Sequence, residues 1–311
     1  MKLVFFDDFI LGAVKDGRVV DLTKTVQEIN HPTPQDLINE VITRFEGVYR
    51  ARFEELLNGS PGRPLEGLRL RPPLPRPGKI VAMAANYLED GALKDPRPIN
   101  AFLKSPESVV GHGDTVVLPP EQASIFHHEA ELGIVIGKEA VNAKASEAYE
   151  YIFGYVNFID VSARGLGGSS FYWGKSWDTF GPLGPFLVTA DEVPDAQKLR
   201  IQLRVNGDPR QDYNTSDMGH KIPRTIEWAS SVVTLEPGDL IACGTNHQGL
   251  GALQDQDHVD MEIDGLGTLH VHIQDDLKRE WPRGIDTEIG EFVAGRTSTG
   301  PSWTGGLTLP R

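Results

Sequence analysis

Two carboxylates, Glu129 and Glu131, stand one residue apart in FHHEAELGIVIG (126–137), directly before an apolar run that favours a buried strand. Alternate side chains of a strand share a face, so both carboxylates project from the same side. Isolated glutamates at a strand end are usually solvated, but this face continues with Gly133 and Val135 rather than with polar residues. Such a pair is suited to a hard divalent cation, Mg²⁺, Mn²⁺ or Ca²⁺, if a third oxygen ligand joins it.

A third carboxylate, Asp160, ends the apolar run in GYVNFIDVSAR (154–164). It is the candidate for the missing ligand, because it again places charge at the edge of a buried element. An aspartate here also fits a turn or a helix N-cap, with Ser162 as a competitor for the cap. The spacing alone leaves both interpretations open.

Composition limits the class of protein that carries these groups. The 311 residues are 39% hydrophobic and 24% charged, a balance typical of a soluble globular protein. A formal charge of −14 disfavours nucleic acid and anionic membranes as partners. The single cysteine, Cys243, excludes an intramolecular disulfide and favours a reducing compartment. The N-terminus does not match a signal peptide, and no segment has the ~18 uninterrupted apolar residues of a membrane span. We therefore expect a cytoplasmic protein.

The first quarter of the chain favours a small α/β domain. Residues 1–28 favour short strands with turns, and 34–57 favour a helix with apolar residues three and four apart. The segment 60–78 is rich in Pro, Gly and Arg, which is typical of a linker. We predict an N-terminal domain at 1–75.

The remaining chain favours strands. Many short β-rich segments separated by Gly, Pro, Asn and Asp turns predict a mainly β domain closed on itself at 76–285. Helical patterns remain at 145–151 and 224–233. The residues from 286 to 311 are polar and rich in Gly, Ser and Thr, so we predict an extended or mobile tail unless Trp303 docks on a partner subunit.

At Glu129, Glu131 and Asp160 the chain resembles the fumarylacetoacetate hydrolase family. The resemblance spans about residues 79–275 and rests on seven blocks that occur in order with compatible spacings. The blocks are KIVAMAANY (79–87), INAFLKSPESVVGHGDTVVLP (99–119), HHEAELGIVIG (127–137), GYVNFIDVSAR (154–164), KSWDTFGPLGPFLV (175–188), VNGDPRQDYNTSDM (205–218) and LEPGDLIACGTNHQGLG (235–251).

The resemblance implies a mainly β fold with helices (α+β), in which a β-roll catalytic domain follows a small N-terminal domain. It implies a homodimer or higher homo-oligomer. It also implies one Mg²⁺ or Mn²⁺ held by Glu129, Glu131 and Asp160, a position that Ca²⁺ can also take.

The implied activity is metal-dependent hydrolysis of a C–C bond in a small β-diketo or 2-oxo acid of acylpyruvate or fumarylpyruvate type. A metal with open positions can chelate such an acid and spread the charge of the enolate that forms. Decarboxylation, keto–enol isomerisation and hydration of a 2-oxo acid are alternatives on the same scaffold. A non-catalytic metal-binding protein is the alternative of another class.

Further polar residues obtain roles from the resemblance. Lys175 matches a lysine that points at the developing oxyanion, and Arg164 is placed to clamp a distal carboxylate. Taken alone, these side chains are better explained as an exposed lysine and a surface ion pair. Four other residues are expected to line the substrate pocket: Lys104, Tyr87, Gly244 and Thr245.

One block departs from the family. Its hydrolases commonly carry N-Y-x-x-H, whose histidine acts on the attacking water with help from a glutamate, whereas this chain has NYLED with Asp90 in the histidine position. Glu89 and Asp90 are therefore the candidate acid–base residues, although an aspartate with a pKa near ~4 is a weak base at neutral pH. His220 and His247 are alternatives. The departure strengthens decarboxylation and tautomerisation as alternatives, while hydrolysis stays the first expectation.

Substrate selection is expected to depend on two loops. One is the segment 91–100, and the other is the glycine-rich segment 165–174, whose aromatic residues can cover a hydrophobic part of the substrate. These aromatic residues equally fit a subunit contact or the anchoring of the loop. They are Phe171, Tyr172 and Trp173. His128, next to the carboxylate pair, is a candidate supporting residue.

Overall fold

The computed structural model describes residues 1–166 and 170–301. Its larger sheet runs in the order β4-β3-β2-β1-β14-β12-β11-β17-β6-β7, with β5 beside β1 and β8 beside β14. The strands of this sheet are β1 (Lys2–Phe6), β2 (Ile10–Lys15), β3 (Arg18–Asp21), β4 (Arg63–Pro64), β5 (Leu70–Arg71), β6 (Ile80–Met83), β7 (Ala101–Lys104), β8 (Val109–Val110), β11 (Ala130–Ile136), β12 (Ile152–Ile159), β14 (Gly181–Thr189) and β17 (Leu240–Ala242).

A second sheet has the strand order β16-β15-β18-β19-β9, and β10 pairs with β13. These strands are β9 (Thr115–Val117), β10 (Ile125–His127), β13 (Ser162–Arg164), β15 (Arg200–Val205), β16 (Asp208–Asn214), β18 (His258–Ile263) and β19 (Gly267–Gln274). Strands β18 and β19 alternate buried and accessible residues, as expected for a sheet with one solvated face. Every residue of β11 and β12 is buried, because both faces of these central strands are covered. The mainly β architecture predicted from the sequence is confirmed.

The helices are short. They are α1 (Thr23–Val26), α2 (Pro34–Arg44), α3 (Arg50–Gly59), α4 (Phe171–Lys175), α5 (Ile222–Val232) and α6 (Thr287–Val293). The single helix predicted over 34–57 is interrupted by a π-helical turn at Phe45–Tyr49. The wider turn directs both Phe45 and Tyr49 into the core, where they are fully buried.

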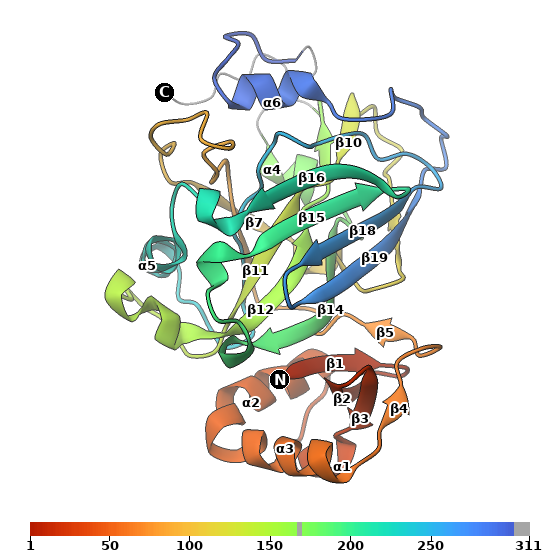
Figure 1. The fold of residues 1–311 in the computed structure, drawn as a ribbon, viewed down its shortest axis with the longest axis vertical. Coiled ribbons are helices and arrows are strands. Elements are labelled where there is room, and N and C mark those ends of the chain that lie inside the picture. The colour runs from red at the N-terminus through yellow and green to blue at the C-terminus, as the bar shows by residue number, and fades with distance from the viewer. Residues whose placement is uncertain (167–169, 302–311) are drawn as a thin grey trace.

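The N-terminal residues join the main sheet. Strand β1 pairs with β14, so that Lys2 lies opposite Val188, and Phe45 packs edge-on against Phe153 of β12 with ring centroids 5.1 Å apart. Figure 1 shows β1–β3 and α1–α3 gathered at one end of the molecule, with α6 at the opposite end. The main sheet and its core thus include residues from both sides of the domain boundary predicted near residue 76. The boundary itself stays a prediction.

One prediction for a segment outside the sheets is wrong. The tail was expected to be extended or mobile, but Thr287–Val293 forms α6, which is capped by Asp286 and packs Ile289 and Phe292 on Leu250. A burial face of only a few apolar residues is enough to dock a helix of this length. Within the glycine-rich segment 165–174, residues from Phe171 onward form the helix α4.

Residues 167–169 and Trp303 lie outside the described part of the chain. Among the helices of the described residues, none combines the length and the apolar character that a bilayer crossing requires.

The contact between the N-terminal helices and the main sheet can be tested through Phe45. Replacing this fully buried ring by alanine (Phe45→Ala) leaves a cavity between α2 and β12. We expect the free energy of unfolding to fall by about 3–5 kcal/mol, measured by denaturant titration. Val232→Ala, at a position that is 68% exposed, should change the free energy of unfolding by no more than about 0.5 kcal/mol. Equal effects of the two substitutions would show that Phe45 is not part of a shared core.

Candidate metal and substrate site

The structure brings Glu129, Glu131 and Asp160 together. One carboxylate oxygen of each lies within 4.8 Å of the others, and all three side chains are buried. Glu131 belongs to β11, while Glu129 lies just before this strand and Asp160 directly follows β12. Because β11 and β12 are antiparallel with Ala130 opposite Ile159, the start of one strand meets the end of the other. The amide of Asp160 donates to the carbonyl of Glu129 at 2.8 Å and fixes this register.

Three cations face the carboxylates. The ammonium of Lys175, at the end of α4, lies 2.6 Å from Glu129 Oε2 and 2.8 Å from Asp160 Oδ2. Lys104, at the end of β7, lies 2.7 Å from Asp160 Oδ1 and also donates to the carbonyl of Lys175. The guanidinium of Arg164 pairs with Glu129. The cationic residues predicted for the site therefore converge on it, and their charges compensate those of two of the three carboxylates directly.

Glu131 has no cation of its own among these contacts. Its Oε2 accepts a hydrogen bond of 2.8 Å from the amide of Gly244. Burial and the negative charges of Asp160 and Glu129 raise the pKa of Glu131 well above its usual range. Burial also disfavours ionisation of Glu129, yet the charges of Lys175 and Arg164 hold the pKa of that carboxyl well below its usual range. The trio thus retains a place where additional positive charge would be stabilising.

The donor set fits a divalent cation. Carboxylate oxygens are the ligands that Mg²⁺, Mn²⁺ and Ca²⁺ prefer, and the three groups come from the start of β11 and the end of β12. Nearby, the hydroxyl of Tyr87 is buried without a hydrogen-bond partner among the described residues, and the Tyr87 ring packs edge-on against Tyr213 at 5.0 Å. A buried hydroxyl without a partner is costly unless a bound group supplies one.

The turn after β17 supports Glu131. Asn86 donates to the carbonyl of Cys243 at 2.9 Å, and the backbone of Gly244 has a φ of +84°. A Cβ at this glycine would lie 3.0 Å from Cβ of Asn86, so only glycine fits without strain. Thr245 donates its hydroxyl to the carbonyl of Ala130 at 2.9 Å. Gly244 and Thr245, the two predicted pocket residues of this turn, therefore donate hydrogen bonds to residues of β11. Their contacts with substrate stay a prediction.

The same turn carries His247, which pairs with Glu89 on the segment after β6. Glu89 Oε1 is 2.8 Å from His247 Nδ1, and Glu89 Oε2 accepts from the His247 amide and from Gln248, each at 2.9 Å. Burial disfavours the charged carboxylate, but the interaction with His247 lowers the pKa of Glu89 below its usual value. Since Gly244 and His247 are three residues apart, one turn connects the carboxylate trio with the glutamate–histidine pair.

Asp90 has a different environment. Its amide donates to Asp217 at 3.0 Å, and the Asn246 side chain donates to both carboxylates, at 3.1 Å to Asp90 and 3.3 Å to Asp217. Burial and the charges of Asp217 and Glu89 raise the pKa of Asp90. His220, the other candidate histidine, places Nε2 2.8 Å from the carbonyl of Arg97. Of the two histidines considered from the sequence, His247 is the one paired with Glu89.

Gln211, on β16, is a supporting residue that the sequence did not reveal. Its Nε2 donates to Thr245 Oγ1 and to the carbonyl of Asn246, both at 2.7 Å. Its Oε1 accepts from the Ala130 amide at 3.0 Å and lies 3.1 Å from His128 Nδ1. The available signal was its position inside the 205–218 block, but its partners depend on the packing of β16 against β11. Ser162 also supports the site, with its hydroxyl 3.1 Å from Glu129.

Helix α6 is tied to the site. His127 Nε2, two residues before Glu129, is 3.1 Å from Asp286, the N-cap of α6. Gln248, which donates to Glu89, also donates to the carbonyl of Gly290 within α6 at 3.1 Å. Helix α6 therefore contacts residues next to the carboxylates and next to the glutamate–histidine pair.

A mainly β fold that buries three carboxylates beside two lysines and a glutamate–histidine pair defines the class of the protein as an enzyme with a centre suited to a divalent cation. Residues 79–274 match the family described as fumarylacetoacetate (FAA) hydrolase, C-terminal. The chain belongs to the fumarylacetoacetate hydrolase family, as the sequence blocks predicted.

Individual relatives differ in the reaction they are named for. The maleylpyruvate hydrolase of Aquipseudomonas alcaligenes is 35% identical over 290 residues, which are 88% of this chain and 99% of that protein. The oxaloacetate tautomerase YisK of Bacillus subtilis is 39% identical over 224 residues, 67% of this chain and 74% of that protein. The crystal structure of maleylpyruvate hydrolase from Sphingobium sp. SYK-6 in complex with manganese(II) ion and pyruvate has a TM-score of 0.81 at 36% identity, and covers 88% of this chain and 99% of that one.

The support that Gln211 gives to the site is testable by Gln211→Ala. The substitution leaves the Ala130 amide and the Asn246 carbonyl buried without this partner, so we expect the free energy of unfolding to fall by about 1–3 kcal/mol for each group left unpaired. Denaturant titration measures the loss. Gln27→Ala, at an exposed position, is the matched control and should have little effect. A Gln211→Ala protein as stable as the control would contradict the network.

Proposed function

We propose that the protein hydrolyses a C–C bond in a small β-diketo acid of acylpyruvate type, with maleylpyruvate and fumarylpyruvate as the first substrates to test. The observation that carries this proposal is the Glu89–His247 pair, 2.8 Å apart, in which His247 lies on the same turn as the Gly244 amide that binds Glu131. Hydrolysis needs a group that activates water beside the centre that binds the diketo acid, and this pair supplies it. The similarity to two maleylpyruvate hydrolases over nearly their whole length supports the same reaction.

A divalent cation is part of the proposal. Glu129, Glu131 and Asp160 would hold it, and Mn²⁺ is supported by the manganese in the similar hydrolase structure. Mg²⁺ remains the alternative ion that we expect from the sequence resemblance. When bound, such a cation polarises a chelated carbonyl and spreads the charge of an enolate.

The contact with Glu89 determines which ring nitrogen of His247 acts on water. Glu89 contacts Nδ1 of His247, so the other ring nitrogen, Nε2, is the one that accepts a proton from water. Water oxygen then bonds to the acyl carbonyl carbon, and the bond from that carbon to the neighbouring CH₂ breaks with its electrons remaining on carbon. Return of the proton to this carbon gives pyruvate and a carboxylic acid. The carboxylate of Glu89 stabilises the protonated imidazole, as in other oriented acid–base pairs.

Two of the three cations, Lys175 and Arg164, are proposed to stabilise negative charge on the substrate. Lys175 lies beside both Glu129 and Asp160, where its ammonium can stabilise the oxyanion that develops on the substrate. Arg164 is partly exposed and can exchange its contact with Glu129 for a bidentate contact with the distal carboxylate of the diketo acid. We assign Lys104 to holding Asp160 and Lys175 rather than to substrate, because its ammonium is buried between them.

Oxaloacetate tautomerisation is the second candidate. It needs a proton to move between carbon and oxygen but no attacking water, and the Asp90 carboxylate that replaces the family histidine favours it. The similarity to an oxaloacetate tautomerase supports it as well. Purified protein with Mn²⁺ should be given an acylpyruvate and oxaloacetate in parallel. Pyruvate release from the acylpyruvate supports hydrolysis, whereas turnover of oxaloacetate alone would favour the tautomerase.

His247 is the residue through which the proposed water activation is tested. His247→Asn removes the proton acceptor, and we expect kcat for acylpyruvate hydrolysis to fall about 10²- to 10⁴-fold. Mn²⁺ affinity, measured by calorimetry, should stay within a few-fold, since the carboxylate trio is retained. His220→Asn provides the comparison, because the ring of His220 contacts a backbone carbonyl. A larger loss in His220→Asn or in Asp90→Asn than in His247→Asn would transfer the role to that residue.

Removal of one carboxylate tests whether the trio of Glu129, Glu131 and Asp160 binds the divalent cation. Glu131→Gln keeps the size of the side chain but withdraws its charge, and we expect Mn²⁺ affinity to fall by at least about 100-fold, because even supporting residues around a metal are worth 10- to 100-fold. Calorimetry with Mn²⁺ and oxalate measures the affinity. Glu147→Gln, at an exposed glutamate, is the control. Unchanged Mn²⁺ binding in Glu131→Gln would exclude the trio as the metal site.

A further inference from the structure

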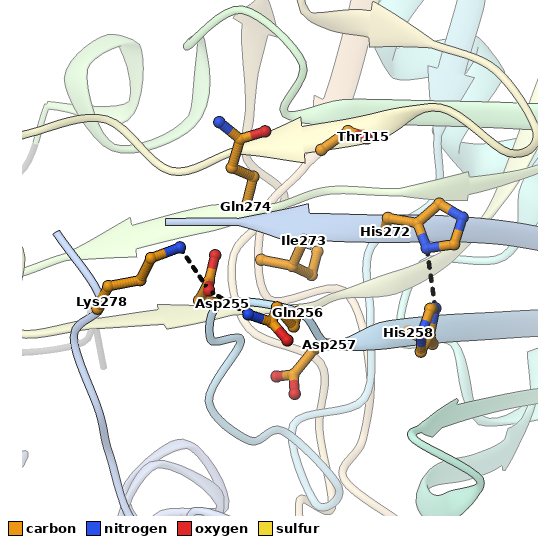
Figure 2. A pocket seen from close by; sticks show the side chains of 9 residues that line it. All are labelled: Thr115, Asp255, Gln256, Asp257, His258, His272, Ile273, Gln274 and Lys278. Atoms are coloured by element: carbon orange, nitrogen blue, oxygen red, sulfur yellow. Dashed lines mark hydrogen bonds and ion pairs between the residues drawn. The ribbon is translucent and has the colours of Figure 1, made fainter. Parts of the chain in front are cut away.

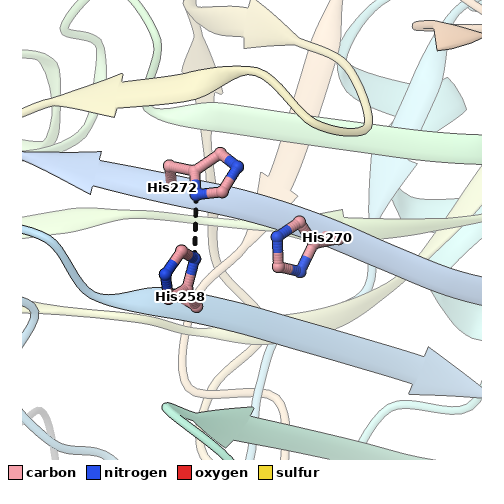
Figure 3. A group of neighbouring side chains, drawn as sticks. All are labelled: His258, His270 and His272. Carbon is pink, nitrogen blue, oxygen red and sulfur yellow. Dashed lines mark hydrogen bonds between the residues drawn. The ribbon is translucent and has the colours of Figure 1, made fainter. Parts of the chain in front are cut away.

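A second cluster of potential ligands lies on the five-stranded sheet. His258 of β18 is directly opposite His272 of β19, and Asp260 is directly opposite His270. Positions two apart on a strand share a face, so these four side chains form one patch on the accessible face. Figure 3 shows the three imidazoles turned toward one another.

The imidazoles are close enough to share one ion. One ring nitrogen each of His258, His270 and His272 lies within 4.8 Å of the others. The ring of His272 has its centroid 4.7 Å from that of His258 and 4.9 Å from that of His270. Nδ1 of His258 and Nδ1 of His272 are 2.8 Å apart. In such a contact one nitrogen donates and the other accepts through its lone pair, and a nitrogen lone pair is what a metal ion binds.

Asp260 orients the third imidazole. Its Oδ1 lies 2.5 Å from Nδ1 of His270, which fixes the proton on Nδ1 and leaves Nε2 of His270 as the lone-pair nitrogen. A carboxylate that holds the far nitrogen of a ligating histidine is a common support around protein-bound zinc. The cluster therefore contains both ligands and a residue that positions one of them.

We propose that His258, His270 and His272 form a binding site for a transition-metal cation of the Zn²⁺, Ni²⁺ or Cu²⁺ type. Three imidazoles suit these borderline ions, whereas Mg²⁺ prefers oxygen ligands. Zn–N bonds of about 2.0–2.1 Å at a tetrahedral angle place two nitrogens about 3.3 Å apart. This separation lies between the 2.8 Å contact of His258 with His272 and the 4.8 Å limit of the cluster, so small side-chain rotations complete the geometry.

The surroundings favour a site with an open coordination position. The inward neighbours on the two strands, Val259, Met261, Leu269 and Val271, are buried and hold the backbone rigidly. His258 and His272 also border a solvent-open hollow of about 480 Å³, and Figure 2 shows them beside its other lining residues. Three protein ligands therefore leave a fourth position for water or a small anion.

The two proposed metal sites differ in ligand chemistry. The trio of Glu129, Glu131 and Asp160 offers buried oxygens, while the histidine cluster offers accessible nitrogens. Excess Mg²⁺ can therefore occupy the carboxylates without competing for the imidazoles. This separation makes the histidine site measurable in the intact protein and independent of its catalytic activity.

The test is Zn²⁺ binding by equilibrium dialysis in excess Mg²⁺, with Co²⁺ absorption as a second readout. The unmodified protein should bind one Zn²⁺ per chain and give the intense visible spectrum of nitrogen-coordinated Co²⁺. The double substitution His270→Ala, His272→Ala should abolish both the binding of this Zn²⁺ ion and the Co²⁺ spectrum. Asp260→Asn should weaken Zn²⁺ binding about 10- to 100-fold while leaving the stoichiometry intact.

His31→Ala, at an exposed histidine remote in sequence from the cluster, is the matched control and should bind as the unmodified protein does. Circular dichroism establishes that each variant is folded. The proposal would be overturned if the double variant bound Zn²⁺ as the unmodified protein does. It would also be overturned if neither protein bound Zn²⁺ in excess Mg²⁺.

Discussion

Compensation of buried negative charge is the constraint on which the centre of this protein depends. Glu129, Glu131 and Asp160 are almost fully buried within a few ångströms of one another, an arrangement that mutual repulsion and lost hydration make unfavourable without cations. Lys104 and Lys175 supply part of the compensation. Within the described part of the chain, Glu131 is paired with a backbone amide and not with a cation, so its environment is the one that most favours an added divalent cation.

The fold meets this constraint by bringing short segments from distant parts of the chain to one place. Antiparallel β11 and β12 place their ends side by side, α4 and β7 deliver the lysines, and the turn after β17 delivers both the amide for Glu131 and the histidine for Glu89. Gln211 then connects β16 with that turn and with β11. The site is therefore a product of strand order, and loss of one supporting contact affects several groups.

Much of the site was predictable because its residues belong to short sequence motifs. Each motif can be recognised without knowledge of the tertiary structure. The carboxylate trio, Lys175 and Arg164 belong to this class, and the structure brings them together. Partnerships were not predictable in the same way. His247 was only one of two candidate histidines, and its pairing with Glu89 rather than with Asp90 follows from how the 244–247 turn packs on the segment after β6.

The fold was predictable in its mainly β character but less so where tertiary packing decides. The turn at Phe45–Tyr49 breaks a periodic helix because both aromatic rings can then enter the core, and periodicity alone does not report this. The helix α6 had a signal in the sequence, Asp286 followed by spaced apolar residues, but the polar composition of the tail concealed it. The pairing of β1 with β14 likewise depends on contacts between segments far apart in the chain.

The central claim is that the carboxylate trio binds a divalent cation that serves a 2-oxo acid. A crystal of the protein soaked with Mn²⁺ and oxalate, examined by anomalous diffraction, tests it most directly. The account predicts one strong manganese peak within about 2.0–2.6 Å of oxygens from Glu129, Glu131 and Asp160, with oxalate completing the coordination. A trio that keeps all its contacts with Lys104, Lys175 and Arg164 and shows no manganese peak would contradict the account.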